Sequence, residues 1–233
     1  MTKTEVKKIA ISVSCSAIII ITDAEEGLRW LKRNQFVLLL RYSKKASALS
    51  KLDGHHDGKY TYLDYTTWDG SERWELIEGV PHMMASPTPE HQHILGELFF
   101  QFRGSLRNGS CTPYIAPLDV TFEQSDLTNT VVQPDLFVMC GEYGHDKRII
   151  GVPDLVVEIL SPSTAADDLV RKMNLYQRVG VQEYWVIEPD KKIINVYLRD
   201  GNLLRWTAEH KPGDMVSPTI SKGLLIDVSA VFA

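Results

Sequence analysis

Two apolar, strand-like runs each carry one acidic residue, and this pattern restricts the possible fold more than any other feature of the chain. Residues 131–140 (VVQPDLFVMC) contain Asp135, and residues 153–160 (PDLVVEIL) contain Glu158. A carboxylate among Val, Leu and Ile is costly to bury unless it is paired or bound to a cation. Because the runs are consecutive, they can form neighbouring strands, which would bring the two carboxylates together. The alternative is that one of them lies exposed on a solvated sheet face.

Close carboxylates repel each other, and each raises the pKa of the other. A hard divalent cation such as Mg²⁺ removes this repulsion, because it takes oxygen ligands and keeps several waters. Such an ion can also polarise a phosphoryl group. The pair Asp135 and Glu158 therefore predicts a divalent-cation site.

Strands and helices alternate in the rest of this region. Apolar residues at helical spacing predict a helix over residues 91–107, after the capping sequence SPTPEH. A second helix is predicted from Thr164, with Asp167 in a capping-box-like pair, to a stop at Gly180. Strands are predicted at residues 113–123, 131–140, 153–160 and 183–188, and hairpins at residues 74–85 and 193–207. This order predicts an α+β domain, in which helices cover a mixed sheet.

Charge separates the chain into two parts. Residues 1–56 hold 10 basic and 5 acidic residues, a net charge of +5, whereas residues 57–233 hold 15 and 25, a net charge of −10. We expect residues 1–56 to be an N-terminal extension of unknown role and residues 57–233 to be the functional domain. The acidic balance argues against a globally basic nucleic-acid binder. A phosphate chain would have to be bound through a local basic patch or through metal ions.

Neither the N-terminal apolar stretch nor the cysteines indicate a membrane or secreted protein. Residues 9–22 include three serines and are too short and too polar for a membrane span, so we expect no membrane association. The cysteines, Cys15, Cys111 and Cys140, are odd in number and widely spaced. They predict no disulfide framework and no CxxC zinc site. Small buried side chains in the reducing cytoplasm are the expected role.

Several segments together resemble one family. They are WELIEG, SPTPEH, QPD, PDLVVEILSPST, DDLVRKMNLYQRVGVQEYWVIEPD and SKGLLIDVSAVF, in this order between residues 60 and 232. This combination is similar to the Uma2 family of the PD-(D/E)xK, restriction-endonuclease-like superfamily. The resemblance implies an αβββαβ core, here with an added N-terminal and an added C-terminal β-hairpin.

The resemblance also implies roles for particular residues. Asp135 would be the acidic residue of the PD element and Glu158 that of the (D/E)xK element, and both would bind Mg²⁺ or Mn²⁺. Leu160 stands where the motif lysine would be, so the substitute is Lys172 on the next helix; without the family it would be an ordinary solvated lysine. His91, at a helix start, would assist proton transfer or position a phosphate, and Glu75 would extend the metal shell.

Two further residues in the EYW segment, Tyr184 and Trp185, are expected in the core.

The expected function is metal-dependent endonuclease cleavage of phosphodiester bonds in DNA by a cytoplasmic protein, with a homodimer as the expectation for cutting both strands. One alternative is a catalytically inactive module of the same fold that binds or regulates without cutting. A second uses Asp135 and Glu158 for glycoside hydrolysis, which would need no metal. Removal of metal ions with a chelator distinguishes the glycosidase from the nuclease.

Overall fold

The computed structural model describes residues 9–13, 17–21, 59–70, 72–161 and 165–233 of the 233-residue chain. The chain separates into two compact units, Met1–Asp53 and Gly54–Ala233, and each is described by itself. In the first unit, β1 (Ile9–Val13) and β2 (Ala17–Ile21) pair as an antiparallel hairpin. The rest of the predicted extension, including Cys15, and the predicted cap Thr164 lie outside the described residues.

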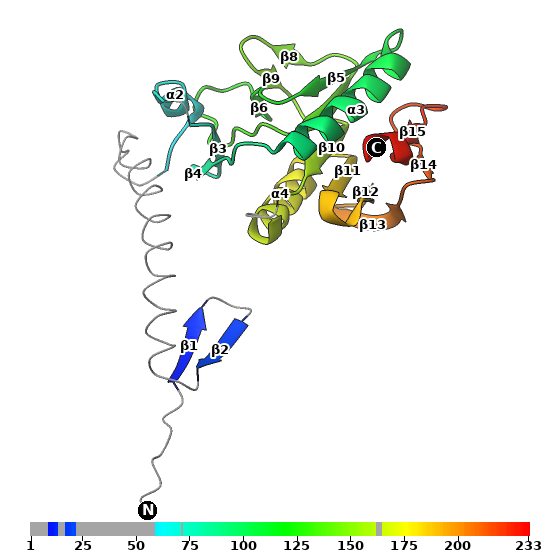
Figure 1. The fold of residues 1–233 in the computed structure, drawn as a ribbon. Coiled ribbons are helices and arrows are strands. Elements are labelled where there is room, and N and C mark those ends of the chain that lie inside the picture. The colour runs from blue at the N-terminus through cyan, green and yellow to red at the C-terminus, as the bar shows by residue number, and fades with distance from the viewer. Residues whose placement is uncertain (1–8, 14–16, 22–58, 71, 162–164) are drawn as a thin grey trace, which may run out of the picture. The chain divides into compact units, whose positions relative to one another are not determined.

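A six-stranded mixed sheet is the centre of the second unit (Figure 1). Its strands in spatial order are β13 (Leu203–His210), β12 (Ile193–Asp200), β11 (Glu183–Glu188), β10 (Leu155–Ile159), β7 (Leu136–Cys140) and β5 (Cys111–Ile115). Strands β10 and β11 run parallel and are joined by helix α4 (Ala165–Val179), and the other neighbours are antiparallel. Helix α3 (Pro89–Leu106) precedes β5, so the chain follows the predicted αβββαβ order. The α+β class is confirmed.

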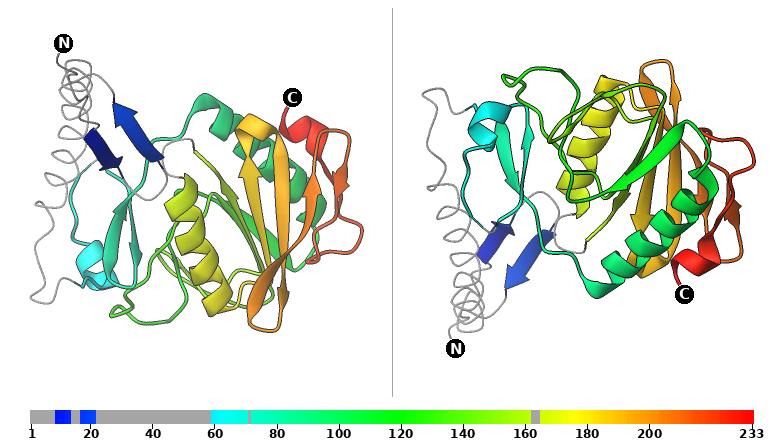
Figure 2. Two further views of the ribbon diagram at one scale, coloured as in Figure 1. Left: turned by 90° about the horizontal axis from the view of Figure 1, so that it is seen from below. Right: turned by 90° about the horizontal axis from the view of Figure 1, so that it is seen from above.

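The two long helices cover opposite faces of this sheet (Figure 2). Alternate residues of β10 divide between the two faces, since Val157 packs in the cluster under α3 and Val156 in the cluster under α4. All five residues of β10 are buried, as expected for a central strand covered on both sides. Glu158 shares the α4 face with Val156, because side chains alternate along a strand. The face of the sheet under α4 therefore carries the acidic side chain.

Smaller elements surround the main sheet. They are α2 (Tyr62–Tyr65), β3 (Trp74–Ile77), β4 (Val80–Met83), β6 (Val120–Thr121), β8 (Gly144–His145), β9 (Ile149–Ile150), the 3₁₀ turn η1 (Pro189–Lys191), β14 (Met215–Val216), β15 (Ile226–Asp227) and α5 (Val228–Val231). The predicted hairpin is confirmed as β3 and β4, with Glu78 and Gly79 in the turn at positive φ. The second predicted hairpin is confirmed as β12 and β13, which extend the main sheet.

Two predicted strands are shorter than expected. The strand predicted at residues 113–123 is divided into β5 and β6, and Pro117 lies between them without an N–H for a ladder. The strand predicted at residues 131–140 is regular only from Leu136 onward, while Val131 and Val132 form isolated bridges to other segments. Asp135 thus lies directly before β7 rather than within it.

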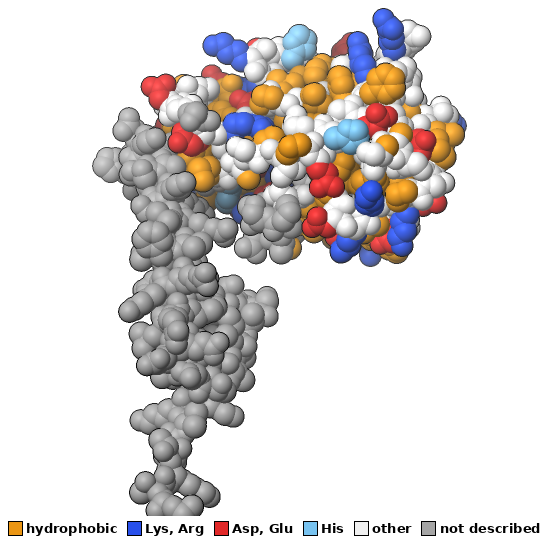
Figure 3. All heavy atoms as spheres, viewed as in Figure 1, with side chains coloured by type: hydrophobic (Ala, Val, Ile, Leu, Met, Phe, Trp, Pro, Cys, Tyr) orange, Lys and Arg blue, Asp and Glu red, His pale blue; other side chains and the backbone are white. Residues whose placement is uncertain are grey.

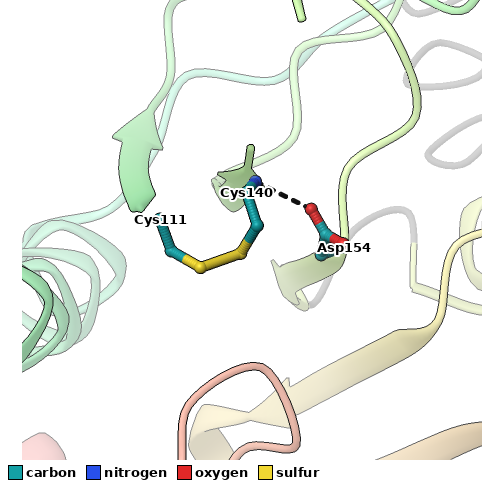
Figure 4. Close-up of a disulfide and its surroundings, with 3 residues drawn as sticks. All are labelled: Cys111, Cys140 and Asp154. Atoms are coloured by element: carbon teal, nitrogen blue, oxygen red, sulfur yellow. Dashed lines mark hydrogen bonds between the residues drawn. A yellow bond between two sulfur atoms is a disulfide. The ribbon is translucent and has the colours of Figure 1, made fainter. Parts of the chain in front are cut away.

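A disulfide joins Cys111 and Cys140, contrary to the prediction from cysteine spacing (Figure 4). The two residues are direct partners in the β5–β7 register, and their Cα atoms are 4.0 Å apart. Two cysteines facing each other on adjacent strands are within bridging distance. Spacing along the sequence could not reveal this, because the pairing depends on the strand register.

Among the described residues, no helix is long and apolar enough to cross a lipid bilayer.

Candidate active site

One cavity of about 320 Å³ brings together all five side chains that the sequence suggested. They come from five different segments: Glu75 from β3, His91 from the first turn of α3, Asp135 from the residue before β7, Glu158 from β10 and Lys172 from α4. The main sheet and the two helices that cover it bring these distant segments together. The cavity is thus lined by residues from the sheet, from both covering helices and from the β3–β4 hairpin.

Asp135 and Glu158 lie side by side because β7 and β10 are antiparallel neighbours. Leu136 pairs with Val157, so continuing the register by one residue sets Asp135 opposite Glu158. The backbone N–H of Ile159 donates to Asp135 Oδ2 at 2.8 Å, which holds the carboxylate against β10. Both acidic side chains line the cavity, so neither is the solvated surface residue that the sequence left open.

Lys172 is buried between two carboxylates instead of extending into solvent. Its Nζ lies 2.9 Å and 3.0 Å from the two oxygens of Glu158 and 3.1 Å from Glu75 Oε1. Its relative exposure is 4%, which excludes an ordinary surface lysine. Helix α4 therefore delivers a cation to β10 from a position 14 residues after Glu158.

Burial and charge act in opposite directions on this pair. Burial raises the pKa of Glu158, with Asp135 and Glu75 adding to the change, whereas the Lys172 ammonium opposes it and favours the carboxylate. Burial alone would lower the pKa of Lys172, but Glu158 and Glu75 together raise it well above its usual range. The lysine therefore stays protonated at neutral pH, because the nearby carboxylates favour its charged form.

Tyr176 is a contact of this site that the sequence reasoning did not assign. Its hydroxyl donates to Glu158 Oε1 at 2.7 Å, and the side chain is fully buried. The signal was present in the sequence, because Tyr176 follows Lys172 by four residues and such residues share a helix face. Tyr176 and Lys172 together fix the orientation of the Glu158 carboxylate.

Gln133, in the QPD segment, holds Glu75 in place. Its backbone N–H donates to Glu75 Oε1 at 2.9 Å. The side-chain oxygen accepts from Arg73 Nε and Nη2 at 3.0 Å and 2.6 Å, and the side-chain nitrogen donates to Tyr65 and Asp119. This network links the β3–β4 hairpin to the segment that leads to Asp135.

His91 contacts the carboxylate from the opposite layer. Its Nε2 lies 3.2 Å from Asp135 Oδ2, and its backbone N–H donates to the side chain of Thr88, the N-cap of α3. The Thr88 cap thus fixes the helical turn that presents the imidazole. His91 is near the positive end of the helix dipole, where an anion is favoured.

Asp135 and Glu158 are the carboxylates at this cavity that would hold a magnesium-type ion, and both oxygens of Glu158 also contact Lys172. No group of three or more His, Cys, Asp and Glu side chains in the described ranges is arranged to hold a metal by protein ligands alone. One or two carboxylates with several waters is, however, the usual Mg²⁺ environment. The contacts of Asp135 given above all use Oδ2, so its other oxygen can serve as a ligand.

Comparisons with known proteins agree with this fold. An uncharacterized protein from Synechocystis sp. is 29% identical over 147 residues, which are 60% of this chain and 76% of that protein. A crystal structure of a protein from Anabaena variabilis, described as a putative nuclease belonging to DUF820, covers 74% of this chain and 97% of the other chain. The two structures superpose with a TM-score of 0.59 at 20% sequence identity, so they share the same fold. The model of the Uma2 family, described as "Putative restriction endonuclease", matches residues 61–229. The chain therefore belongs to the Uma2 family, as its motifs suggested.

Proposed function

We propose that this protein is a Mg²⁺- or Mn²⁺-dependent endonuclease that hydrolyses phosphodiester bonds in DNA. The observation that carries the proposal is the meeting of Asp135, Glu158 and a buried Lys172 at one cavity. Family membership supports a nuclease, and the paired carboxylates support metal dependence. The fold alone would not support it, since one fold serves many functions.

Each side chain has a role that follows from its position. Asp135 and Glu158 would hold the ion, with the backbone carbonyl of Ile159 as a further ligand. When bound, the ion lowers the pKa of a water and neutralises charge on the scissile phosphate. Lys172 orients the attacking water or stabilises the negative charge that develops on the oxygens of the pentavalent phosphorane, because its ammonium is already held beside Glu158.

Glu75 and His91 have supporting roles in this proposal. Glu75 extends the acidic group and keeps Lys172 in place through its 3.1 Å contact. His91, whose Nε2 lies 3.2 Å from Asp135 Oδ2, positions a phosphate or transfers a proton at the N-terminus of α3. Both roles depend on atoms that already lie at the cavity wall.

The distribution of surface charge favours contact with a short stretch of nucleic acid over tight binding along a long duplex. On the face drawn in Figure 3, basic and acidic side chains are interspersed among the described residues. Residues 57–233 carry a net charge of −10, whereas tight binding to long duplexes needs many Lys or Arg contacts to phosphates. The proposal also includes a homodimer, because cutting both strands of a duplex needs two sites.

The decisive experiment incubates the full chain with plasmid DNA, single-stranded DNA and RNA in the presence of Mg²⁺, Mn²⁺ or EDTA. We expect cleavage of DNA with either metal and none with EDTA. Asp135→Asn and Glu158→Gln should each lower the rate at least about a hundredfold, because several kcal/mol of charge stabilisation depend on the ion. Glu158→Gln is preferable to Glu158→Ala, because it keeps the hydrogen-bonding shape around Lys172.

The matched control is Asp200→Asn, an acidic residue on β12 paired with Arg205 at the surface. It should cleave at the parent rate. Cleavage that persists in EDTA, or in either active-site variant, would contradict the proposal. Metal binding without turnover on any nucleic acid would instead favour the inactive module, and metal-independent hydrolysis of glycosides would favour the glycosidase.

A further inference from the structure

Buried polar atoms without a partner are concentrated at the same cavity. In the described part of the chain they are His91 Nδ1, Arg171 Nε and the Tyr184 hydroxyl, and all three residues line the cavity. Buried polar groups in native proteins are nearly always hydrogen-bonded, so each exception needs an explanation. The three residues line one cavity, so a single ligand bound there would give these atoms a partner. His91 belongs to the site described above, whereas Arg171 and Tyr184 have no role there.

Tyr184 is held rigidly on the same sheet face as Glu158. It pairs with Val156 in the parallel β10–β11 register, and Val156 is two residues before Glu158. Its side chain has a relative exposure of 0%, and its ring packs against Tyr176 and Tyr197, with centroids 5.2 Å and 6.1 Å away. This packing fixes the direction of the ring, and Tyr184 lines the cavity.

The charges around this hydroxyl belong to the cavity. Burial raises the pKa of Tyr184 well above its usual range, and Glu158 adds to this effect while Lys172 opposes it. The phenol thus remains protonated and is available as a donor at physiological pH. Arg171 provides a second donor on α4, where its Nη2 binds Asp168 at 2.7 Å and its Nε is left over.

We propose that Tyr184 and Arg171 form a phosphate-binding subsite, in which the hydroxyl and Nε donate hydrogen bonds to phosphoryl oxygens of the nucleic-acid backbone. This inference rests on the proposed function, because it names how the same cavity holds its substrate. Phosphate is the chemistry that fits, since hydroxyl groups and guanidinium groups are common donors to phosphate oxygens in nucleic-acid complexes. The neighbouring Lys172 adds positive charge to the same wall.

The test measures binding without chemistry. A fluorescently labelled DNA oligonucleotide is titrated with the full chain in EDTA, and fluorescence anisotropy gives Kd. Tyr184→Phe should raise Kd about tenfold, the usual effect of losing one hydrogen bond to a charged group. Its melting temperature should stay the same or rise, because the variant removes a buried hydroxyl that has no internal partner. The matched control is Tyr197→Phe, which alters the neighbouring ring outside the cavity and should leave Kd unchanged.

Arg171→Gln is the second variant, on a different element, and it should also weaken binding about tenfold. Unchanged Kd in both variants, or a lower melting temperature for Tyr184→Phe, overturns the subsite. If the parent binds DNA but cleaves none with Mg²⁺, a weaker Tyr184→Phe complex supports the subsite while hydrolysis is refuted. If the parent neither binds nor cleaves, both proposals fail.

Discussion

Lys172 is the residue on which the charge balance of the cavity depends. Its ammonium contacts Glu158 and Glu75, and both carboxylates are almost fully buried. A buried ion pair adds little net stability compared with apolar residues, but removal of one partner leaves an uncompensated charge. The lysine therefore contributes to the stability of the folded chain as well as to the proposed chemistry.

We expect Lys172→Met to lower the free energy of unfolding by about 3–5 kcal/mol, the usual result of breaking a buried pair. Methionine keeps a similar length, so the loss reflects charge rather than a cavity. Urea denaturation followed by circular dichroism measures the change. The double variant Lys172→Met/Glu158→Gln should recover part of the loss, because one of the two orphaned charges is removed with its partner. Strictly additive losses in the double variant would disprove the coupling.

At the scale of elements, the start of α3 links a helix cap to the cavity. The Thr88 side chain accepts a hydrogen bond from the backbone N–H of His91, whose ring contacts Asp135. The cap is therefore a positioning feature of the site and not only of the helix.

Thr88→Ala should lower the free energy of unfolding by about 1 kcal/mol, because the His91 N–H loses its acceptor. It should also slow cleavage, since the first turn of α3 loosens next to Asp135. Thr88→Ser keeps the hydroxyl and should restore both values. Chemical denaturation and cleavage rates, measured on the parent, the alanine variant and the serine variant, test both expectations. Equal stability of the alanine and serine variants would show that the cap is unimportant.

The β3–β4 turn is a second element that positions the site, because β3 carries Glu75. Gly79 has φ +81°, and a Cβ at this position would lie 2.8 Å from Lys59 Cβ. We expect Gly79→Ala to cost about 1 kcal/mol or more, through the positive φ and the clash together. Gly201 is the matched control, with φ +61° and no atom within 4 Å of its Cβ position. Gly201→Ala should lower the free energy of unfolding by less, and thermal unfolding of both variants measures the difference. Equal losses of stability would show that the contact with Lys59 has no effect.

Local signals in the sequence predicted the elements well, whereas contacts between distant segments were harder to predict. The end of α4 before Gly180 and the bounds of β11 followed from residues within those segments. The Cys111–Cys140 disulfide and the second contact of Lys172, to Glu75, depend on register and on packing between layers. Tyr184 was correctly predicted as buried, but its place at the cavity follows only from the strand pairing.

At the scale of the whole molecule, the disulfide ties the edge strand β5 to the strand β7 that follows Asp135. It closes a loop with a sequence separation of 29 residues. Chain entropy for a loop of this size predicts a stabilisation of about 3–4 kcal/mol. We expect dithiothreitol to lower the free energy of unfolding by this amount, measured with urea. A Cys111→Ala/Cys140→Ala variant should show no response to the reductant, and a response there would assign the effect to another cause.

The order in which the five cavity segments occur along the chain has a consequence for synthesis. A growing polypeptide that has emerged only as far as β10 holds Glu75, Asp135 and Glu158 but not yet the lysine of α4. Until that helix docks, the acidic groups repel one another and favour hydration over burial. Burial of this cluster is thus delayed until translation has passed α4.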